Sequence, residues 1–382
     1  MTETRPIRDL DSYFQEELNK RKASHLYRTW APPLQATKAD FISNNYLGLA
    51  GNTIDLLDEQ NSGEISLLPS GSTGSRLVSG NHPILKELEE ACAHFFNAES
   101  CLFFQNGYMA NLALLSVAAG RQDTYIYDDA CHVSLKDGMR LSLATKYPFR
   151  HNDPEDLERK LKKAVGRIFI VVESIYSMDG DLCALQPIAA LAEKYHAHII
   201  LDEAHSTGTI GPSGRGLTAM MGMEDRIWAR IYTFGKALGA SGAVLSISKT
   251  TKEYLTNFSH PVIYSTAPMP VHAGICLEQL RCLQQNPVLT EKLQANITHW
   301  NKSGESIGSV ISKNKMSPVQ YFLMTGNENA LHTAKHLETL GYQTKAMLSP
   351  TVKAGTERLR ISLHSFNSST QIDELIRLLG EF

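Results

Sequence analysis

The sequence lacks the features of several classes of protein. Its 382 residues include six cysteines, at positions 92, 101, 131, 183, 276 and 282, without a CxxC pair or metal-type spacing, so we expect neither a disulfide framework nor a metal site. Lys and Arg number 37 against 40 Asp and Glu, which leaves no basic excess for nucleic acid. No run approaches the roughly 20 apolar residues of a membrane span. The first eleven residues carry charges and no apolar core, so we expect no secretory signal and a cytoplasmic location.

Nucleotide-binding fingerprints are missing too. Neither G-x-G-x-x-G nor G-x-x-x-x-G-K-[ST] occurs, and Gly235-Lys236 is followed by alanine. With 42% hydrophobic and 20% charged residues the composition is that of an ordinary globular protein, and the length exceeds one typical domain. We expect an N-terminal helical segment over residues 1–40, with a helix over about 11–30, a large α/β domain over 41–268 and a smaller C-terminal domain over 269–382.

Three polar residues follow two predicted strands. The apolar run 227–231 leads to Thr233-Phe-Gly-Lys236, and the run 198–201 leads to Asp202-Glu-Ala-His205. Alone, Lys236 is more typical of a solvated loop lysine than of a chemical group. In an open α/β sheet, however, ligands bind at the carboxyl ends of the strands, where both clusters fall. We therefore expect Lys236, Asp202 and His205 to converge.

This trio suits pyridoxal phosphate. A lysine amine forms a Schiff base with the cofactor aldehyde, and an aspartate beside the pyridine nitrogen keeps that nitrogen protonated, so that the ring accepts electrons. His205 is placed to hydrogen-bond the ring's 3-oxygen or carboxyl partners. Metal binding by the pair His196 and His198 is disfavoured because no third ligand lies at metal spacing.

A phosphate site is expected where the apolar run 101–104 breaks at Asn106-Gly107 into a helix. Helix amino termini leave backbone donors free and attract anions, so Gly107 and Tyr108 are candidates for amide contacts to the cofactor phosphate. A plain strand-to-helix turn explains the same pattern equally well. His132, just past another strand, is by itself more typical of a packed or surface residue.

Four stretches together resemble one family. They are Ser43-Asn-Asn-Tyr-Leu-Gly48, Leu201-Asp-Glu-Ala-His205, Thr233-Phe-Gly-Lys236 and Arg358-Leu-Arg360. They resemble the α-oxoamine synthases, fold-type I pyridoxal phosphate enzymes, and the resemblance runs from about Asn44 to Ser362. It implies a large domain with a mainly parallel central sheet, a smaller α/β C-terminal domain and a homodimer.

The resemblance also implies residue roles. Lys236, His132 and Asp202 would be catalytic, and Asn44, Thr351 and Arg360 would bind the amino-acid substrate. Cofactor contacts would come from Gly107, Tyr108, His132, Ser177, Asp202, His205, Thr233, Lys236 and Thr266. Thr266 would act in the neighbouring subunit's site, as would the loop of Gly71 and Arg76.

The sequence suggests different roles for three arginines, Arg360, Arg358 and Arg28. Arginine's planar fork suits a carboxylate, and we expect only Arg360 of the pair on the last strand to enter the site. Arg358 is expected to point to the opposite face and to stay solvated. Arg28 is a candidate for contact with the acyl substrate that the sequence does not decide.

Within the family, the chain most resembles the branch that makes 8-amino-7-oxononanoate in biotin biosynthesis. The implied reaction is a decarboxylative condensation of L-alanine with a pimeloyl thioester of coenzyme A or acyl carrier protein. The alternatives are another α-oxoamine synthase, such as glycine C-acetyltransferase, 5-aminolevulinate synthase or serine palmitoyltransferase, and a non-catalytic partner subunit, which typically lacks the lysine. A pyridoxal-dependent transcription regulator would need a DNA-binding domain, for which the amino-terminal region is too short.

Overall fold

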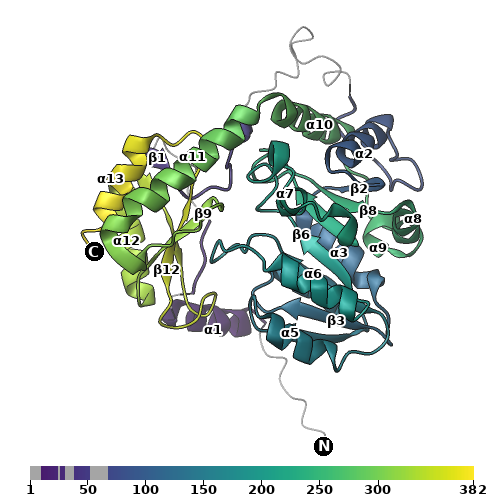
Figure 1. Ribbon diagram of the computed structural model, residues 1–382, viewed down its shortest axis with the longest axis horizontal. Coiled ribbons are helices and arrows are strands. Elements are labelled where there is room, and N and C mark those ends of the chain that lie inside the picture. Colours follow the sequence, from purple (N-terminus) through teal and green to yellow (C-terminus); the bar gives the residue numbers. More distant parts are fainter. Residues whose placement is uncertain (1–9, 25, 31–37, 52–67) are drawn as a thin grey trace, which may run out of the picture.

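The computed structural model describes residues 10–24, 26–30, 38–51 and 68–382. The charged amino terminus, residues 1–9, lies outside these ranges. Figure 1 shows a large sheet with its helices beside a smaller sheet covered by the C-terminal helices. Within the described ranges, no helix is both long and apolar enough to cross a membrane.

A seven-stranded sheet forms the centre of the larger part. Its order is β2-β8-β7-β6-β5-β3-β4, and β8 runs antiparallel to both of its neighbours while the other pairings are parallel. The strands are β2 (Ser100–Phe104), β3 (Thr124–Asp128), β4 (Thr145–Phe149), β5 (Ile168–Glu173), β6 (His198–Asp202), β7 (Ala229–Thr233) and β8 (Ala243–Ile247). The predicted mainly parallel α/β sheet is therefore confirmed.

Helices cover both faces of this sheet, and the strand sequences show why. Every residue of β5, Ile-Phe-Ile-Val-Val-Glu, is buried, as expected of a parallel strand between two helical layers. Phe169 and Val171 pack with the cluster that contains α3 and α4, whereas Ile170 and Val172 pack with the cluster that contains α5 and α6. The helices of this part are α3 (Gly107–Ala118), α4 (Val133–Leu141), α5 (Pro154–Leu161), α6 (Leu185–Lys194), α7 (Leu217–Met221), α8 (Lys249–Phe258) and α9 (His260–Ile263).

The C-terminal part contains an antiparallel sheet of order β11-β12-β9. The predicted strands and helices of this region are confirmed as β9 (Val319–Leu323), β12 (Arg358–Ser362), α12 (Asn327–Thr339) and α13 (Ser369–Leu379), beside β11 (Lys345–Met347). The helices α10 (Pro270–Gln285) and α11 (Pro287–Ser303) lead to it from the larger part (Figure 1). A short parallel pair, β1 (Ala39–Asp40) with β10 (Tyr342–Gln343), ties the amino-terminal chain to this part.

The two amino-terminal helices differ in packing. The helix predicted over about 11–30 is the shorter α1 (Leu10–Ala23), of which no residue is buried. At its end, Ser24 N and Ser24 Oγ both donate to the Lys20 carbonyl, at 3.1 and 2.9 Å. In contrast, α2 (Pro83–Phe95) buries Leu85, Leu88 and Cys92 in the main core.

One loop of the large sheet reaches the small sheet. After β5 the chain turns through residues 174–182, where Asn314 Nδ2 donates to the Asp179 carbonyl at 2.6 Å and Arg358 pairs with the Asp179 carboxylate. Gly180 has φ +70°, and a Cβ there would lie 2.0 Å from the Val319 carbonyl oxygen, so only glycine fits this approach.

The prediction for Arg358 is wrong. Its side chain is buried rather than solvated, and it points toward the same loop as Arg360. The physical reason is strand periodicity, because positions i and i+2 of a strand face the same side of the sheet.

A charged network also holds this loop, at Asp181. His151 Nδ1 lies 2.9 Å from Asp128 Oδ1, and its Nε2 lies 2.9 Å from Asp181 Oδ2. Burial opposes the charge on His151, but the hydrogen bonds and charges of Asp128 and Asp181 outweigh it and raise its pKa from 6.5 to about 10. His151 is therefore an imidazolium between two carboxylates at neutral pH.

We predict that His151→Ala lowers the free energy of unfolding by about 3 kcal/mol at pH 6, because it leaves the fully buried Asp128 carboxylate without its cationic partner. The stabilisation from the raised pKa is fully present below pH 6.5 and is lost as the pH rises toward 10, so the difference between variant and wild type should narrow over that range. Urea unfolding of both proteins at several pH values measures this difference in the free energy of unfolding. The control is His299→Ala, whose pair with Asp373 is more exposed and should contribute under about 1 kcal/mol. Equal losses in the two variants would contradict the prediction.

Candidate active site

A cavity of about 470 Å³ opens where the strands of the large sheet end. Glu173, Asp202 and Thr233, which line it, are the last residues of β5, β6 and β7. The small sheet contributes Lys345, Met347 and Arg360. The predicted site residues that the structure brings together here are Asn44, Gly107, Tyr108, His132, Ser177, Asp202, His205, Thr233, Lys236 and Arg360.

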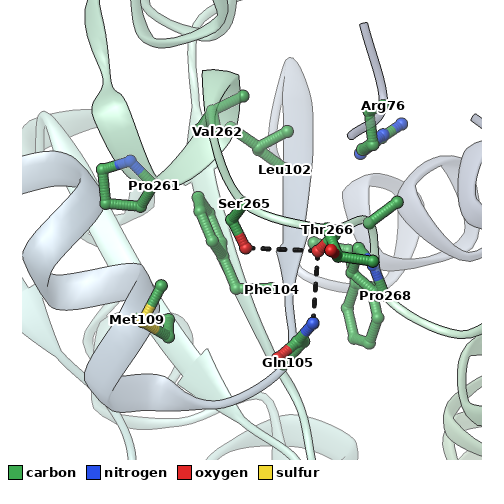
Figure 2. A pocket seen from close by; sticks show the side chains of 12 residues that line it. Arg76, Leu102, Phe104, Gln105, Met109, Pro261, Val262, Ser265, Thr266 and Pro268 are labelled. Atoms are coloured by element: carbon green, nitrogen blue, oxygen red, sulfur yellow. Dashed lines mark hydrogen bonds between the residues drawn. The ribbon is translucent and has the colours of Figure 1, made fainter. Parts of the chain in front are cut away.

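Two predicted site residues lie elsewhere. Thr351 is exposed and is not part of this lining. Thr266 lines a second cavity, of about 30 Å³, together with Arg76 and Gln105. Figure 2 shows Ser265 and Gln105 converging on Thr266, whose carbonyl oxygen accepts from Ser265 Oγ at 3.2 Å and from Gln105 Nε2 at 3.3 Å. The roles of Thr266 and Thr351 stay predictions, and Arg28 is exposed outside both cavities.

Lys236 stands on the tight connection between β7 and β8. The turn is closed by hydrogen bonds from Phe234 N to the Gly242 carbonyl and from Gly239 N to the Lys236 carbonyl, at 2.9 and 3.0 Å. Ala237 and Leu238 are buried, which anchors the turn and leaves the half-buried lysine directed into the cavity.

The electrostatics around Lys236 favour its neutral amine. Burial lowers the pKa of the ammonium from 10.5 to about 8, and the Arg360 charge acts in the same direction. The carboxylates of Asp202 and Glu173 oppose the shift. Burial and the charge of Asp202 raise the pKa of Glu173 to about 8. Lys236 is thus a lysine whose amine can act as a nucleophile or base near neutral pH.

A hydrogen-bond chain connects Asp202 to His132. Asn111 Nδ2 donates to Asp202 Oδ2 at 3.1 Å and to Ser134 Oγ at 2.9 Å. His132 Nδ1 accepts from Ser134 N at 3.3 Å, so this nitrogen carries no proton, and Ser134 Oγ, 2.7 Å away, donates to it. The network therefore assigns the ring proton of neutral His132 to Nε2, and burial lowers the pKa of this imidazole. His132 also caps α4 through Ser134 N.

A second chain runs from His205 to Arg360. His205 Nδ1 lies 2.7 Å from the Tyr46 hydroxyl, which donates to Asn44 Oδ1 at 3.1 Å. Arg360 Nη2 donates to the same Asn44 oxygen at 3.0 Å, and its Nε donates to the Ser177 carbonyl at 2.8 Å. Burial lowers the pKa of His205 well below 6.5 and raises that of Tyr46 to about 12, so both are neutral.

Glu203, the neighbour of Asp202, has a structural role. Glu203 is fully buried away from the cavity and accepts from Leu217 N and Thr218 N, each at 2.9 Å, at the start of α7. The turn after β6 thereby presents Asp202 and His205 to the cavity while the glutamate between them fixes the turn.

The residues at the start of α3 suit an anion. Asn106 caps the helix by accepting from Met109 N at 2.9 Å, and the amino terminus of the helix opens on the cavity at Gly107 and Tyr108. A Cβ on Gly107 would lie 2.8 Å from Thr233 Cγ2, so a side chain there would displace the wall. Thr233 Oγ1 is buried without a hydrogen-bond partner among the described residues, which leaves a donor for a bound group.

Sequence reasoning missed several cavity residues. The sequence assigns no role to Glu173, Asn111 and Ser134, which line the cavity, or to Tyr46, which lies outside the lining and contacts His205. Lys345 and Met347 belong to no recognisable motif of the sequence, because only the pairing of β11 with β12 brings them to the site. The polar end of an otherwise apolar strand could have identified Glu173, since it repeats the pattern of Asp202.

We predict that Lys236 of the ligand-free protein reacts with trinitrobenzenesulfonate with a pH midpoint near 8. Asp202→Asn should lower this midpoint, since it removes an attraction for the ammonium, and Arg360→Gln should raise it by removing a repulsion. Peptide-resolved mass spectrometry follows the labelling, and the exposed Lys86 serves as internal control. A Lys236 profile that matches that of Lys86 would refute this account of the site.

Comparison with known proteins agrees with the geometry. Residues 36–379 match the family described as aminotransferase class I and II. The chain is 34% identical over 381 residues to an 8-amino-7-oxononanoate synthase of Marinobacter nauticus, covering 96% of this chain and 95% of the relative. It is 35% identical over 338 residues to one of Lysinibacillus sphaericus, covering 88% and 86% of the two chains.

Solved structures give the same result. A serine palmitoyltransferase from S. paucimobilis with a bound PLP–myriocin adduct has a TM-score of 0.87 at 25% identity, with 99% of this chain and 98% of that chain covered. An 8-amino-7-oxononanoate synthase from Francisella tularensis has a TM-score of 0.76 at 27% identity, with 89% and 97% covered. The predicted fold-type I transferase fold is confirmed, and the chain belongs to the aminotransferase class I and II family, among the relatives of the 8-amino-7-oxononanoate synthases.

Proposed function

We propose that this chain is a pyridoxal phosphate-dependent acyltransferase of biotin biosynthesis. It condenses L-alanine with a pimeloyl thioester, with loss of carbon dioxide and of the thiol carrier, to give 8-amino-7-oxononanoate. The observation that carries the proposal is the meeting of Lys236, Asp202 and Arg360 in one cavity. The names of the curated relatives, over nearly the whole chain, support the choice of reaction.

The residues present fit pyridoxal phosphate. Two structures similar to this chain contain PLP by name, which supports it as the cofactor. When bound, it supplies an aldehyde for a lysine and a ring that accepts the electron pair released at the substrate's α carbon. The unpaired Thr233 Oγ1 and the start of α3 would hold the phosphate, and Asp202 would hold the pyridine nitrogen.

Lys236 then moves the proton. With its pKa lowered to about 8, its amine is basic enough to take the α-proton of alanine and is neutral in a useful fraction of molecules at physiological pH. His132, with its proton on Nε2, faces the same cavity and would donate a hydrogen bond to an oxygen of cofactor or substrate. Asn111 orients both Asp202 and the serine that orients His132.

Arg360 positions the amino acid. Its Nε and Nη2 are already fixed by the Ser177 carbonyl and Asn44 Oδ1, so the guanidinium enters the cavity in a set orientation. A planar, preorganised fork binds a carboxylate with two parallel hydrogen bonds. Tyr108, Met178 and Met347 give the cavity apolar walls for the acyl chain.

The assembly we propose is a homodimer in the cytoplasm, to which coenzyme A or an acyl carrier protein delivers the acyl group. Leu77, Val78 and Tyr264 are 53%, 83% and 78% exposed and lie close in sequence to Arg76 and Thr266. Large apolar side chains in such number near one cavity support a subunit interface there. Thr266 would then contribute to the cofactor phosphate of the neighbouring subunit.

A second candidate is a serine palmitoyltransferase-like reaction, which the structural match at 99% coverage of this chain favours. The decisive assay offers alanine, glycine and serine with pimeloyl, acetyl and palmitoyl thioesters to the purified holoenzyme. Alanine with the pimeloyl thioester should give the highest kcat/KM. Preference for serine with the palmitoyl thioester would overturn the proposed function and leave the family unchanged.

We predict that Arg360→Lys raises the KM for alanine roughly 10- to 100-fold, because a lysine cannot replace the bidentate hydrogen bonds to a carboxylate. Steady-state kinetics at saturating acyl thioester measure the change. Arg377→Lys on the exposed face of α13 is the matched control and should leave the KM for alanine unchanged. An Arg360→Lys enzyme that folds normally and keeps its KM would contradict the assigned role.

We predict that Lys236→Ala lowers kcat by roughly 10²- to 10⁴-fold, the usual contribution of a positioned general base. Product formation by mass spectrometry measures the loss. The exposed Lys86 offers the control variant Lys86→Ala, which should retain full activity. Near-normal turnover by Lys236→Ala would refute the role of this lysine.

A further inference from the structure

A lysine on the small sheet faces the cavity and has no task in the reaction described above. Lys345 begins β11, and its direct partner across the antiparallel pair with β12 is Arg360. Directly opposed residues project from the same face of a sheet, with Cβ atoms about 5 Å apart. Both side chains accordingly line the cavity.

The charges on this face are not balanced by the protein. Arg358, next to Arg360 on the same face, is paired with the Asp179 carboxylate. The hydrogen-bond partners of Arg360 are neutral oxygens, and no described side chain forms a hydrogen bond or ion pair with the Lys345 ammonium. Two opposed cations repel each other unless anions lie beside them. The cavity therefore offers a second cation, the exposed side chain of Lys345, beside the guanidinium of Arg360.

The surroundings of Lys345 narrow the choice of an anion for this cation. Met347 follows it on the same face of β11, and Met178 and Tyr108 also line the cavity, so an apolar surface lies beside the ammonium. A polymethylene chain that ends in a carboxylate matches this combination. The nearest phosphate of coenzyme A or an acyl carrier protein is separated from the thioester by the pantetheine arm, which is longer than a pimeloyl chain and extends away from it.

We propose that Lys345 binds the free terminal carboxylate of the acyl chain and thereby selects dicarboxylic acyl thioesters over ester-capped or simple fatty acyl thioesters. This inference rests on the proposed function, and it makes Lys345 a specificity-determining residue rather than a catalytic one.

The test compares pimeloyl-CoA, its terminal methyl ester and heptanoyl-CoA at saturating alanine with the wild-type holoenzyme and with Lys345→Met. Wild type should prefer pimeloyl-CoA roughly tenfold in kcat/KM, as expected for one charged hydrogen bond. Lys345→Met should lose this preference through a higher KM for pimeloyl-CoA, with kcat and the values for the uncharged chains little changed. Lys345→Arg should restore most of the preference. The matched control, Lys335→Met on the exposed side of α12, should behave as wild type.

A second arm varies the carrier. Pimeloyl N-acetylcysteamine has no phosphate, and Lys345→Met should weaken its use as strongly as that of pimeloyl-CoA. A loss that occurs only with coenzyme A thioesters would overturn the proposal in favour of a phosphate contact. An unchanged preference for pimeloyl-CoA in a folded Lys345→Met enzyme would also overturn it.

Measurements of pimelate binding test the role of Lys345 independently of the proposed function. Isothermal titration of the holoenzyme with pimelate and heptanoate should show weaker pimelate binding in Lys345→Met and no change for heptanoate. If wild type fails to convert pimeloyl thioesters, the proposed function fails, while this difference in pimelate binding would still support the carboxylate site. Equal pimelate binding in both proteins would overturn the site itself.

Discussion

The site depends on the burial of one ammonium between carboxylates at the edge of a parallel sheet. Lys236 is placed there by the tight turn after β7. Asp202 and Glu173 end β6 and β5, the next two strands after β7 in the sheet order. Burial lowers the lysine pKa by more than the two carboxylates raise it. A lowered lysine pKa makes the neutral amine accessible near physiological pH, which covalent and proton-transfer chemistry requires, and the fold provides it before any ligand binds.

The second constraint is the contact between the two sheets. The loop after β5 supplies the Ser177 carbonyl to Arg360 and the Asp179 carboxylate to Arg358, so one loop fixes both arginines of β12. His151 holds the same loop from the other side through Asp181. Arg360 belongs to the small sheet and Lys236 follows a strand of the large sheet, and this loop helps to keep both side chains in one cavity. A charge network outside the cavity lining therefore contributes to the geometry of the site.

Much of this was predictable because the chemistry lies at strand ends. The strands that end in Asp202 and near Lys236 are apolar runs bounded by polar turns, and such runs indicate both the sheet and the edge where a ligand binds. The predicted helices near residues 83–96, 328–340 and 370–380 are likewise confirmed within one or two residues at most ends. The helix α1 was predicted too long, because the sequence pattern does not show that it lacks a packing surface.

The rest required tertiary information. Asn111 lies in the middle of α3 and reads as an ordinary helical residue, yet its amide joins Asp202 to Ser134 because α3 packs across the end of β6. Lys345 becomes a cavity residue only through its register with Arg360. Pairings between distant segments are not encoded in local periodicity, which is why residues of this kind escape a reading of the sequence.

Three cations, Arg358, Arg360 and Lys345, lie on one face of the small sheet and differ in how the protein pairs their charges. Arg358 has a carboxylate partner and packs 4.6 Å from the Tyr321 ring centroid, so its charge is used within the protein. Arg360 is oriented by neutral oxygens and keeps its charge available, and Lys345 has no partner within the described chain. The number of charged partners thus falls from one for Arg358, at the loop contact, to none among the described residues for Arg360 and Lys345. Under the proposed function, Arg360 and Lys345 keep their charges for the carboxylates of the two substrates, whereas the charge of Arg358 stabilises the contact between the two sheets.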